Sequence, residues 1–221
     1  MASLLKCFRH TVITAFTAVS VVAVLVVADQ VADLSFVADA SAQDAPKKKE
    51  RETRKTPALR NNIYEKLAEA QVFAEEKQYV EAEEVLNEML DATSKKSKLN
   101  KYELANVYNT YAYLRYAVED YAGALNYYRK VIDQRPEIPL ALEIGTLYTV
   151  AQLYFLQEEW QKGIDTLNQW MAASDNPSTN AYVLLANGYY QLKDYDKSLF
   201  NIETAIERDQ AAGKLPKEQW Y

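Results

Sequence analysis

The stretch TLYTVAQLYFLQEEWQKGIDTLNQW, residues 146–170, decides the fold of this chain. Leu147, Val150 and Tyr154 recur at the spacing of one helix face, and Trp160 then opens a second periodic run. The stretch therefore predicts two short helices that pack face to face. Because a pair of this length leaves its outer apolar faces uncovered, it needs further copies of itself on either side.

The same pattern of small and aromatic residues recurs in four copies along the chain. Each copy has an aromatic residue that starts the second helix and a small residue three positions later, at Tyr79/Ala82, Tyr121/Ala124, Trp160/Gly163 and Tyr195/Ser198. A second small residue precedes each of these, at Ala70, Ala112, Ala151 and Ala186. Small side chains let two helix backbones approach closely, and the aromatic residues beside them fill the remaining space.

These residues resemble the tetratricopeptide repeat, in which two antiparallel helices carry small and aromatic residues at fixed positions. The resemblance covers roughly residues 60–221 and implies an all-α, right-handed solenoid of antiparallel helix pairs, with about four repeats and the start of a fifth. The copies are spaced more widely than the usual ~34 residues, and Lys66 and Glu69 stand where the first helix should be apolar. The expected helices cover 60–76 with 79–92, 100–117 with 121–134, 138–157 with 160–173, and 180–192 with 195–211.

Residues 1–42 are predicted to be a secretory signal peptide. A basic start precedes an uncharged apolar run over residues 11–28, and Ala40-Ser41-Ala42 matches a small-x-small cleavage site. The run is also long enough to remain in the membrane as an uncleaved anchor. Both alternatives predict that the rest of the chain is exported.

Residues 43–59 form a basic segment with few apolar residues, which predicts a flexible arm. The segment contains the run Lys47, Lys48 and Lys49. One interpretation is a solvated linker, and the alternative is weak contact with an anionic membrane surface. Export argues against nucleic acid as a partner. Because the whole chain has a net charge of −6, the repeats after this basic arm are strongly acidic.

The composition argues against catalysis. The single cysteine and the single histidine, Cys7 and His10, lie within the predicted signal, so the exported part lacks thiol, imidazole and Cys/His metal chemistry. No glycine-rich phosphate loop is present. Adjacent acids at Glu158 and Glu159 leave a carboxylate-based cell-wall hydrolase as an alternative, although neighbouring acids on a helix point to different faces. We therefore expect no enzyme activity, no cofactor and no bound metal.

In the tetratricopeptide fold, the first helix of each pair lines the concave face, which implies a binding site for an extended peptide or another protein. The inward positions of this chain are Asn106, Asn109, Tyr113, Tyr116, Tyr148, Gln152, Phe155, Asn180, Asn187 and Tyr190. Asn and Gln side chains both donate to and accept from a peptide backbone, and tyrosines add stiff contact area with a polar end. The alternative is that several of these tyrosines only pack against the neighbouring repeat.

A narrower resemblance rests on TLYTVAQLYF, NPSTNAYVLLANGYYQL and GKLPKEQW, which begin at residues 146, 176 and 213. These segments are similar to exported proteobacterial repeat proteins encoded with the TonB–ExbB–ExbD system. The resemblance implies a periplasmic scaffold whose partners are TonB-system or other envelope proteins. LPKEQWY, residues 215–221, also repeats the way in which earlier pairs begin, so we expect a longer repeat protein with an open apolar end. A structural, self-associating envelope protein is therefore the second functional hypothesis.

Overall fold

The computed structural model describes residue 54 and residues 57–91 and 98–215. The chain divides into two units, Met1–Thr53 and Arg54–Tyr221, and every described residue belongs to the second. The predicted signal peptide, most of the predicted basic arm and the predicted start of a fifth repeat therefore lie outside the described residues. Within the described part, no helix is both long enough and apolar enough to cross a membrane.

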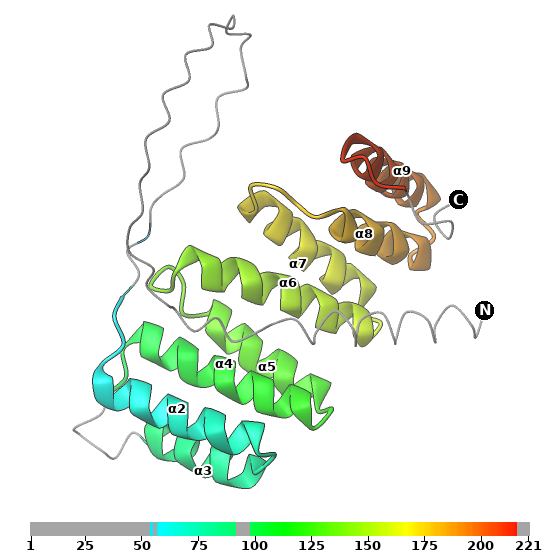
Figure 1. Ribbon diagram of the computed structural model, residues 1–221. Coiled ribbons are helices and arrows are strands. Elements are labelled where there is room, and N and C mark those ends of the chain that lie inside the picture. The colour runs from blue at the N-terminus through cyan, green and yellow to red at the C-terminus, as the bar shows by residue number, and fades with distance from the viewer. Residues whose placement is uncertain (1–53, 55–56, 92–97, 216–221) are drawn as a thin grey trace, which may run out of the picture. The chain divides into compact units, whose positions relative to one another are not determined.

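The described part of the second unit consists of eight α-helices that form four antiparallel pairs (Figure 1). The pairs are α2 (Asn61–Glu75) with α3 (Tyr79–Leu90), α4 (Lys101–Ala117) with α5 (Tyr121–Ile132), α6 (Leu140–Leu156) with α7 (Trp160–Ala173), and α8 (Thr179–Gln191) with α9 (Tyr195–Ala211). No strand occurs among the described residues. The predicted all-α solenoid of helix pairs is confirmed.

The same tight turn closes every pair. Its central residue has a positive φ between 60° and 63° in all four copies, at Lys77, Glu119, Glu158 and Lys193. The next residue donates its backbone N–H to a carbonyl of the last helical turn, as Gln78 does to Phe73 at 2.8 Å and Glu159 does to Tyr154 at 2.9 Å. This left-handed cap satisfies carbonyl groups at the end of the first helix. It also reverses the direction of the chain. The second helix begins at the aromatic residue of the repeat, two residues after the residue with positive φ.

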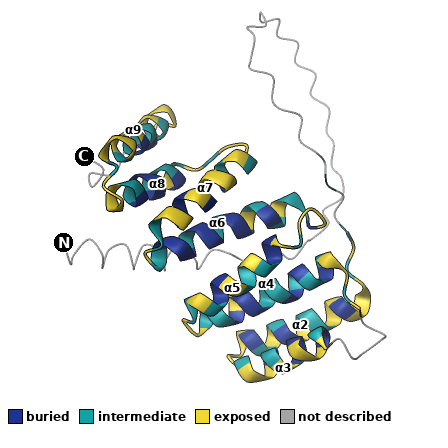
Figure 2. Cartoon of the chain, turned by 180° about the vertical axis from the view of Figure 1, so that it is seen from behind, coloured by how far each residue is buried: buried dark blue, intermediate teal, exposed yellow. Residues whose placement is uncertain are grey.

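The small residues that define the repeat lie where helices approach most closely. The alanines Ala70, Ala112, Ala151 and Ala186 are all buried, as are Ala82 and Ala124 of the second helices. Figure 2 shows that buried residues gather where the helices face one another. Large side chains fill the space beside the small ones, as the fully buried Leu86 and Leu167 do in α3 and α7. The predicted close packing within each repeat is confirmed.

Two positions of α2 that are apolar in the repeat pattern carry charged residues. Lys66 and Glu69 form an ion pair with 3.1 Å between Nζ and Oε2, and both side chains remain partly exposed. Their counterparts in α6, Leu147 and Val150, are buried. Lys66 Nζ also lies 3.6 Å from Oε2 of Glu88 in α3, so the polar residues at these two positions form ion pairs where α6 has apolar packing.

The last residues of the predicted flexible arm are docked on the repeats. Arg54 forms an ion pair with the buried Glu143 in the first turn of α6, and Nη1 of Arg135 approaches the same carboxylate at 3.3 Å. Leu59 packs against the core of the first helix pair. Arg54 and Leu59, at the end of the predicted arm, thus contact the helix pairs, and the arginines compensate a carboxylate that the fold buries.

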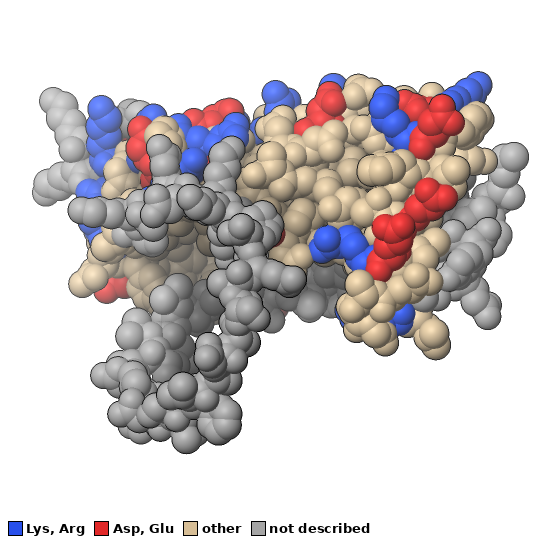
Figure 3. Space-filling view, turned by 90° about the horizontal axis from the view of Figure 1, so that it is seen from above, with Lys and Arg blue, Asp and Glu red and all other residues tan. Residues whose placement is uncertain are grey.

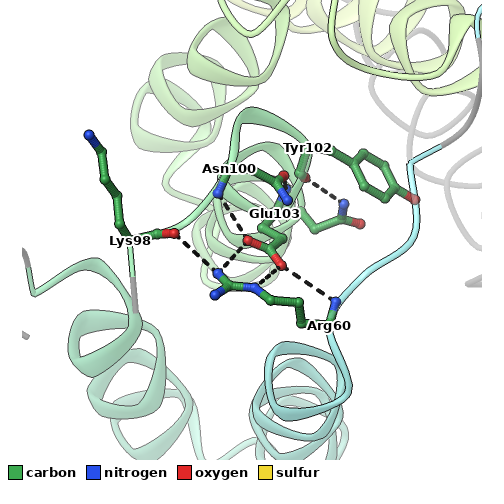
Figure 4. A network of polar contacts seen from close by, with 6 residues as sticks. Arg60, Lys98, Asn100, Tyr102 and Glu103 are labelled. Carbon is green, nitrogen blue, oxygen red and sulfur yellow. Dashed lines mark hydrogen bonds and ion pairs between the residues drawn. The ribbon is translucent and has the colours of Figure 1, made fainter. Parts of the chain in front are cut away.

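A second buried carboxylate fixes the start of α4 (Figure 4). Glu103 is fully buried, and its two oxygens each accept a hydrogen bond of 2.7 Å from the guanidinium of Arg60. Glu103 also accepts from the backbone N–H of Asn100 at 2.9 Å, while the Asn100 side chain accepts from the Glu103 N–H, which completes a capping box. The bond from Arg60 is the largest cause that lowers the pKa of Glu103, and burial opposes it.

The pair between Arg60 and Glu103 predicts that the stability of the fold decreases at acidic pH. Because the folded-state pKa of Glu103 is lowered, its carboxylate contributes stability above the unfolded-state pKa and loses that contribution as the pH falls through the folded-state pKa. We expect Arg60→Ala to raise the pKa of Glu103 and to move the acid-unfolding midpoint to higher pH, as followed by far-UV circular dichroism. Lys162→Ala, which breaks the exposed pair with Glu159, is the control and should leave the midpoint in place. An unchanged midpoint in Arg60→Ala would contradict the role of this junction.

Candidate functional site

The predicted binding residues lie on three consecutive first helices. Four are on α4 (Asn106, Asn109, Tyr113 and Tyr116), three on α6 (Tyr148, Gln152 and Phe155) and three on α8 (Asn180, Asn187 and Tyr190). These helices follow one another along the stack (Figure 1). All of these residues except Phe155 keep part of their surface exposed. We call these nine partly or fully exposed residues the amide–tyrosine surface.

Phe155 belongs to the interior, and its prediction as a surface residue is wrong. Its side chain is 1% exposed, and its ring lies 6.3 Å from the ring of Trp160. A Cβ added at Gly163 would lie 3.1 Å from the Phe155 ring, and one added at Gly188 would lie 2.7 Å from it. Gly188 belongs to α8, so the following repeat covers this ring and no partner can reach it.

The tyrosines divide between packing and exposure. The ring of Tyr116 lies 5.3 Å from that of Tyr121, and the ring of Tyr148 lies 4.8 Å from that of Trp170. Burial raises the pKa of both Tyr116 and Tyr148. Tyr113 is instead exposed on α4. Packing against the neighbouring helix thus accounts for much of the surface of Tyr116 and Tyr148, whereas Tyr113 is 46% exposed.

The side-chain amides on this surface differ in whether they already form hydrogen bonds within the protein. The Nδ2 group of Asn106 donates to the Tyr102 carbonyl of its own helix at 2.8 Å. Within the described part of the chain, the side chains of Asn109, Gln152 and Asn187 form no hydrogen bond to protein. Each of these three amides can therefore both donate to and accept from a ligand.

The amide–tyrosine surface also carries almost no charge over α6 and α8. The sequence of α8 contains no charged residue, and the one charged residue of α6 is Glu143, which is buried and paired with arginines. On α4, the guanidinium of Arg115 is held by Glu83 at 2.7 Å. A surface of this kind lacks the cations that would hold a carboxylate or phosphate group. It suits the uncharged backbone of an extended polypeptide.

The two acids considered for hydrolysis do not form a paired site. Glu158 is the exposed residue at the positive-φ position of the turn between α6 and α7. The Glu159 carboxylate forms an ion pair with Lys162 in the next turn of α7. No group of three His, Cys, Asp or Glu residues that could hold a metal ion occurs among the described residues.

Solved structures share this fold at low sequence identity, whereas no protein-family model and no curated protein match the chain. The crystal structure of MamA superposes with a TM-score of 0.52 at 15% identity, over 69% of this chain and 81% of that chain. The apo form of RapI gives 0.55 at 14% identity, over 69% and 57% of the two chains. The TPR-like repeats of a putative kinesin light chain from Podosopora anserina give 0.52 at 16% identity, over 68% and 76%. The fold is therefore that of a tetratricopeptide-like helical repeat.

Proposed function

We propose that this protein is a non-catalytic scaffold that binds an extended segment of another protein along the first helices of its repeats. The observation that carries the proposal is the row of unengaged amides at Asn109, Gln152 and Asn187, spread over three successive repeats. Amides on successive repeats can pair with peptide groups of one extended chain. The exposed Tyr113 adds stiff contact area between them.

The lack of charge narrows the class of partner. Because α6 and α8 present no accessible ion, affinity has to come from backbone hydrogen bonds and aromatic contact, neither of which depends strongly on salt. The partner segment is therefore uncharged or weakly charged where it crosses α6 and α8. It is recognised within a chain and not through a terminal carboxylate.

We further propose that the protein works in the periplasm with envelope proteins, those of the TonB system included. The support for this location is the signal-like sequence of residues 1–42, and the support for the partner is the resemblance of the repeats to proteins encoded with that system. The lysines Lys47, Lys48 and Lys49 add a site for weak contact with an anionic membrane surface.

The triple variant Asn109→Ala, Tyr113→Ala and Asn187→Ala tests the binding surface. Three lost contacts of ~0.5–1.5 kcal/mol each predict at least a tenfold weaker affinity for the main partner that crosslinking identifies in periplasmic extract. The measurement is titration of the purified pair. None of the three side chains is buried, so the melting temperature should stay near that of the parent.

The control for this test is a triple variant on the second helices, Val80→Ala, Asn126→Ala and Asn168→Ala, whose side chains are also exposed. It should retain the parent's affinity. Full affinity in the first variant, or equal loss in both, would move binding away from the amide–tyrosine surface.

A further inference from the structure

Two successive first helices each carry a tyrosine and a side-chain amide one turn apart on the amide–tyrosine surface. Asn109 and Tyr113 have this spacing on α4, and Tyr148 and Gln152 have it on α6. Asn187 supplies a further amide on α8. All five side chains are partly or fully exposed. The surface therefore places an aromatic ring beside a hydrogen-bonding group in one repeat after another.

Two tyrosine rings of this surface are held in place by aromatic residues of the second helices. Trp170 of α7 packs against Tyr148 with 4.8 Å between ring centroids, and Tyr121 of α5 packs edge-on against Tyr116 at 5.3 Å. Tyr116 and Tyr148 nevertheless keep part of their surface exposed. A ring that is already fixed loses little conformational entropy when a ligand packs on it. Such rings suit a rigid apolar group of the partner.

The hydrogen bonds to a partner have to come from side chains. The amide-bearing residues Asn109, Gln152 and Asn187 lie within helices, where backbone N–H and C=O groups already pair with one another. An ordinary extended segment brings one N–H and one C=O group per residue, and each N–H that is buried without an acceptor is costly. Three side-chain amides cannot satisfy so many groups. A segment with few N–H groups therefore binds this surface at the lowest cost.

Proline meets this requirement and also matches the rings. It has no backbone N–H, and its side chain is a rigid apolar ring. Proline-rich segments form the polyproline II helix, which has no internal hydrogen bonds, so its carbonyl groups remain free to accept from side-chain amides. Because this helix is formed before binding, little entropy is lost, and aromatic-lined surfaces are its usual docking sites.

The other common modes of peptide recognition fit the described surface less well. Strand addition needs the edge of a sheet, and no strand occurs among the residues that the structure describes. A bound amphipathic helix needs an apolar groove, whereas amides lie along this surface. Acidic or phosphorylated segments need clustered cations, and α6 and α8 contain no Lys or Arg. Seen from above, from the side on which α9 lies in Figure 1, the described helices also show a broad area without charged side chains (Figure 3).

We propose that the amide–tyrosine surface recognises a proline-rich segment in the polyproline II conformation. Proline rings of the segment pack on Tyr113 and Tyr148. Its carbonyl groups accept hydrogen bonds from Asn109, Gln152 and Asn187. This inference rests on the proposed function, because it names the class of segment that the same surface binds.

The test uses the full-length protein and two fluorescein-labelled peptides of roughly 12 residues with blocked ends. One peptide consists of Pro-Pro-Ala units. The other consists of Ser-Ser-Ala units, which keep the length and the lack of charge but restore the backbone N–H groups. We expect the proline peptide to bind saturably in fluorescence anisotropy, with an affinity at least about tenfold higher than that of the serine peptide. Equal affinities, or no binding of the proline peptide, would overturn the proposal.

Removal of the rings tests the assignment of residues. Tyr113→Ala and Tyr148→Ala should each weaken binding of the proline peptide, whereas Tyr113→Phe keeps the ring and should bind nearly as the parent does. Tyr113 is exposed, so its truncation leaves the fold intact even if that of Tyr148 does not. Phe200→Ala removes an exposed ring from the second helix α9 and is the control. Equal loss in the Phe200 and Tyr113 alanine variants would contradict the proposed site.

The natural partner separates this inference from the proposed function. If the triple variant Asn109→Ala, Tyr113→Ala and Asn187→Ala loses that partner but the parent binds both peptides equally, the proposed function stands and the proline assignment fails. If the triple variant keeps the partner while Tyr113→Ala loses the proline peptide, the partner binds elsewhere and the proline site stands.

Discussion

Phe155→Ala should lower the free energy of unfolding by about 3–5 kcal/mol, the usual loss for a buried phenylalanine. The ring lies between Trp160 of its own pair and Gly188 of the next, so its removal opens a cavity at the joint between the third and fourth repeats. Urea denaturation followed by circular dichroism measures this change. Since neighbouring repeats stabilise one another through such joints, hydrogen exchange should show α8 and α9 opening before the other helices.

Tyr190→Ala is the matched control for this substitution. Tyr190 holds the equivalent position in the last pair and is exposed, so its truncation should cost roughly 1 kcal/mol or less. Similar losses in the two variants would mean that Phe155 does not form the joint. The comparison also separates packing from binding, because Phe155 was expected from sequence to face a partner.

Gly188→Leu is expected to lower the free energy of unfolding by roughly 3 kcal/mol or more, at the upper end of overpacking effects. Even the first added carbon would lie 2.7 Å from Phe155 and 2.9 Å from Ile164, and both of these side chains are only 1% exposed. The intrinsic preference of helices for leucine over glycine is worth only about 1 kcal/mol and cannot offset this clash. Thermal unfolding of the purified variant measures the result.

Gly145→Leu makes the same chemical change at a position without neighbours. Gly145 lies within α6, and a Cβ added there meets nothing within 4 Å. We expect this variant to be more stable than the parent by roughly 0.5–1 kcal/mol, because only helix propensity changes. If both leucine variants were stabilised, the close crossing of α8 over the third pair would be refuted.

The sequence was sufficient to predict the helices and their pairing. The expected helices 138–157 and 160–173, for example, correspond to Leu140–Leu156 and Trp160–Ala173 in the structure. This success has a local cause, since helix periodicity and the small residues at helix contacts are both visible within one repeat. The recurrence of this pattern in four copies then predicted that the pairs stack on one another.

Contacts between repeats were harder to predict. The position of Phe155 in the repeat pattern predicts that its side chain faces inward. It does not predict that the backbone of α8 covers the ring at Gly188. Likewise, the capping box of Asn100 and Glu103 is readable from its spacing. Its partner Arg60 lies 43 residues away in sequence, next to the predicted flexible arm, and no local spacing indicates this pairing. The same holds for Arg54, within the predicted arm, which pairs with the buried Glu143.

The first and last described helices differ in what they expose. Lys66 and Glu69 of α2 form an ion pair with both side chains partly exposed, whereas Leu199 and Phe200 of α9 are exposed apolar side chains. Exposed apolar side chains lower solubility and charged ones raise it, so α9 contributes more than α2 to the tendency of the protein to aggregate.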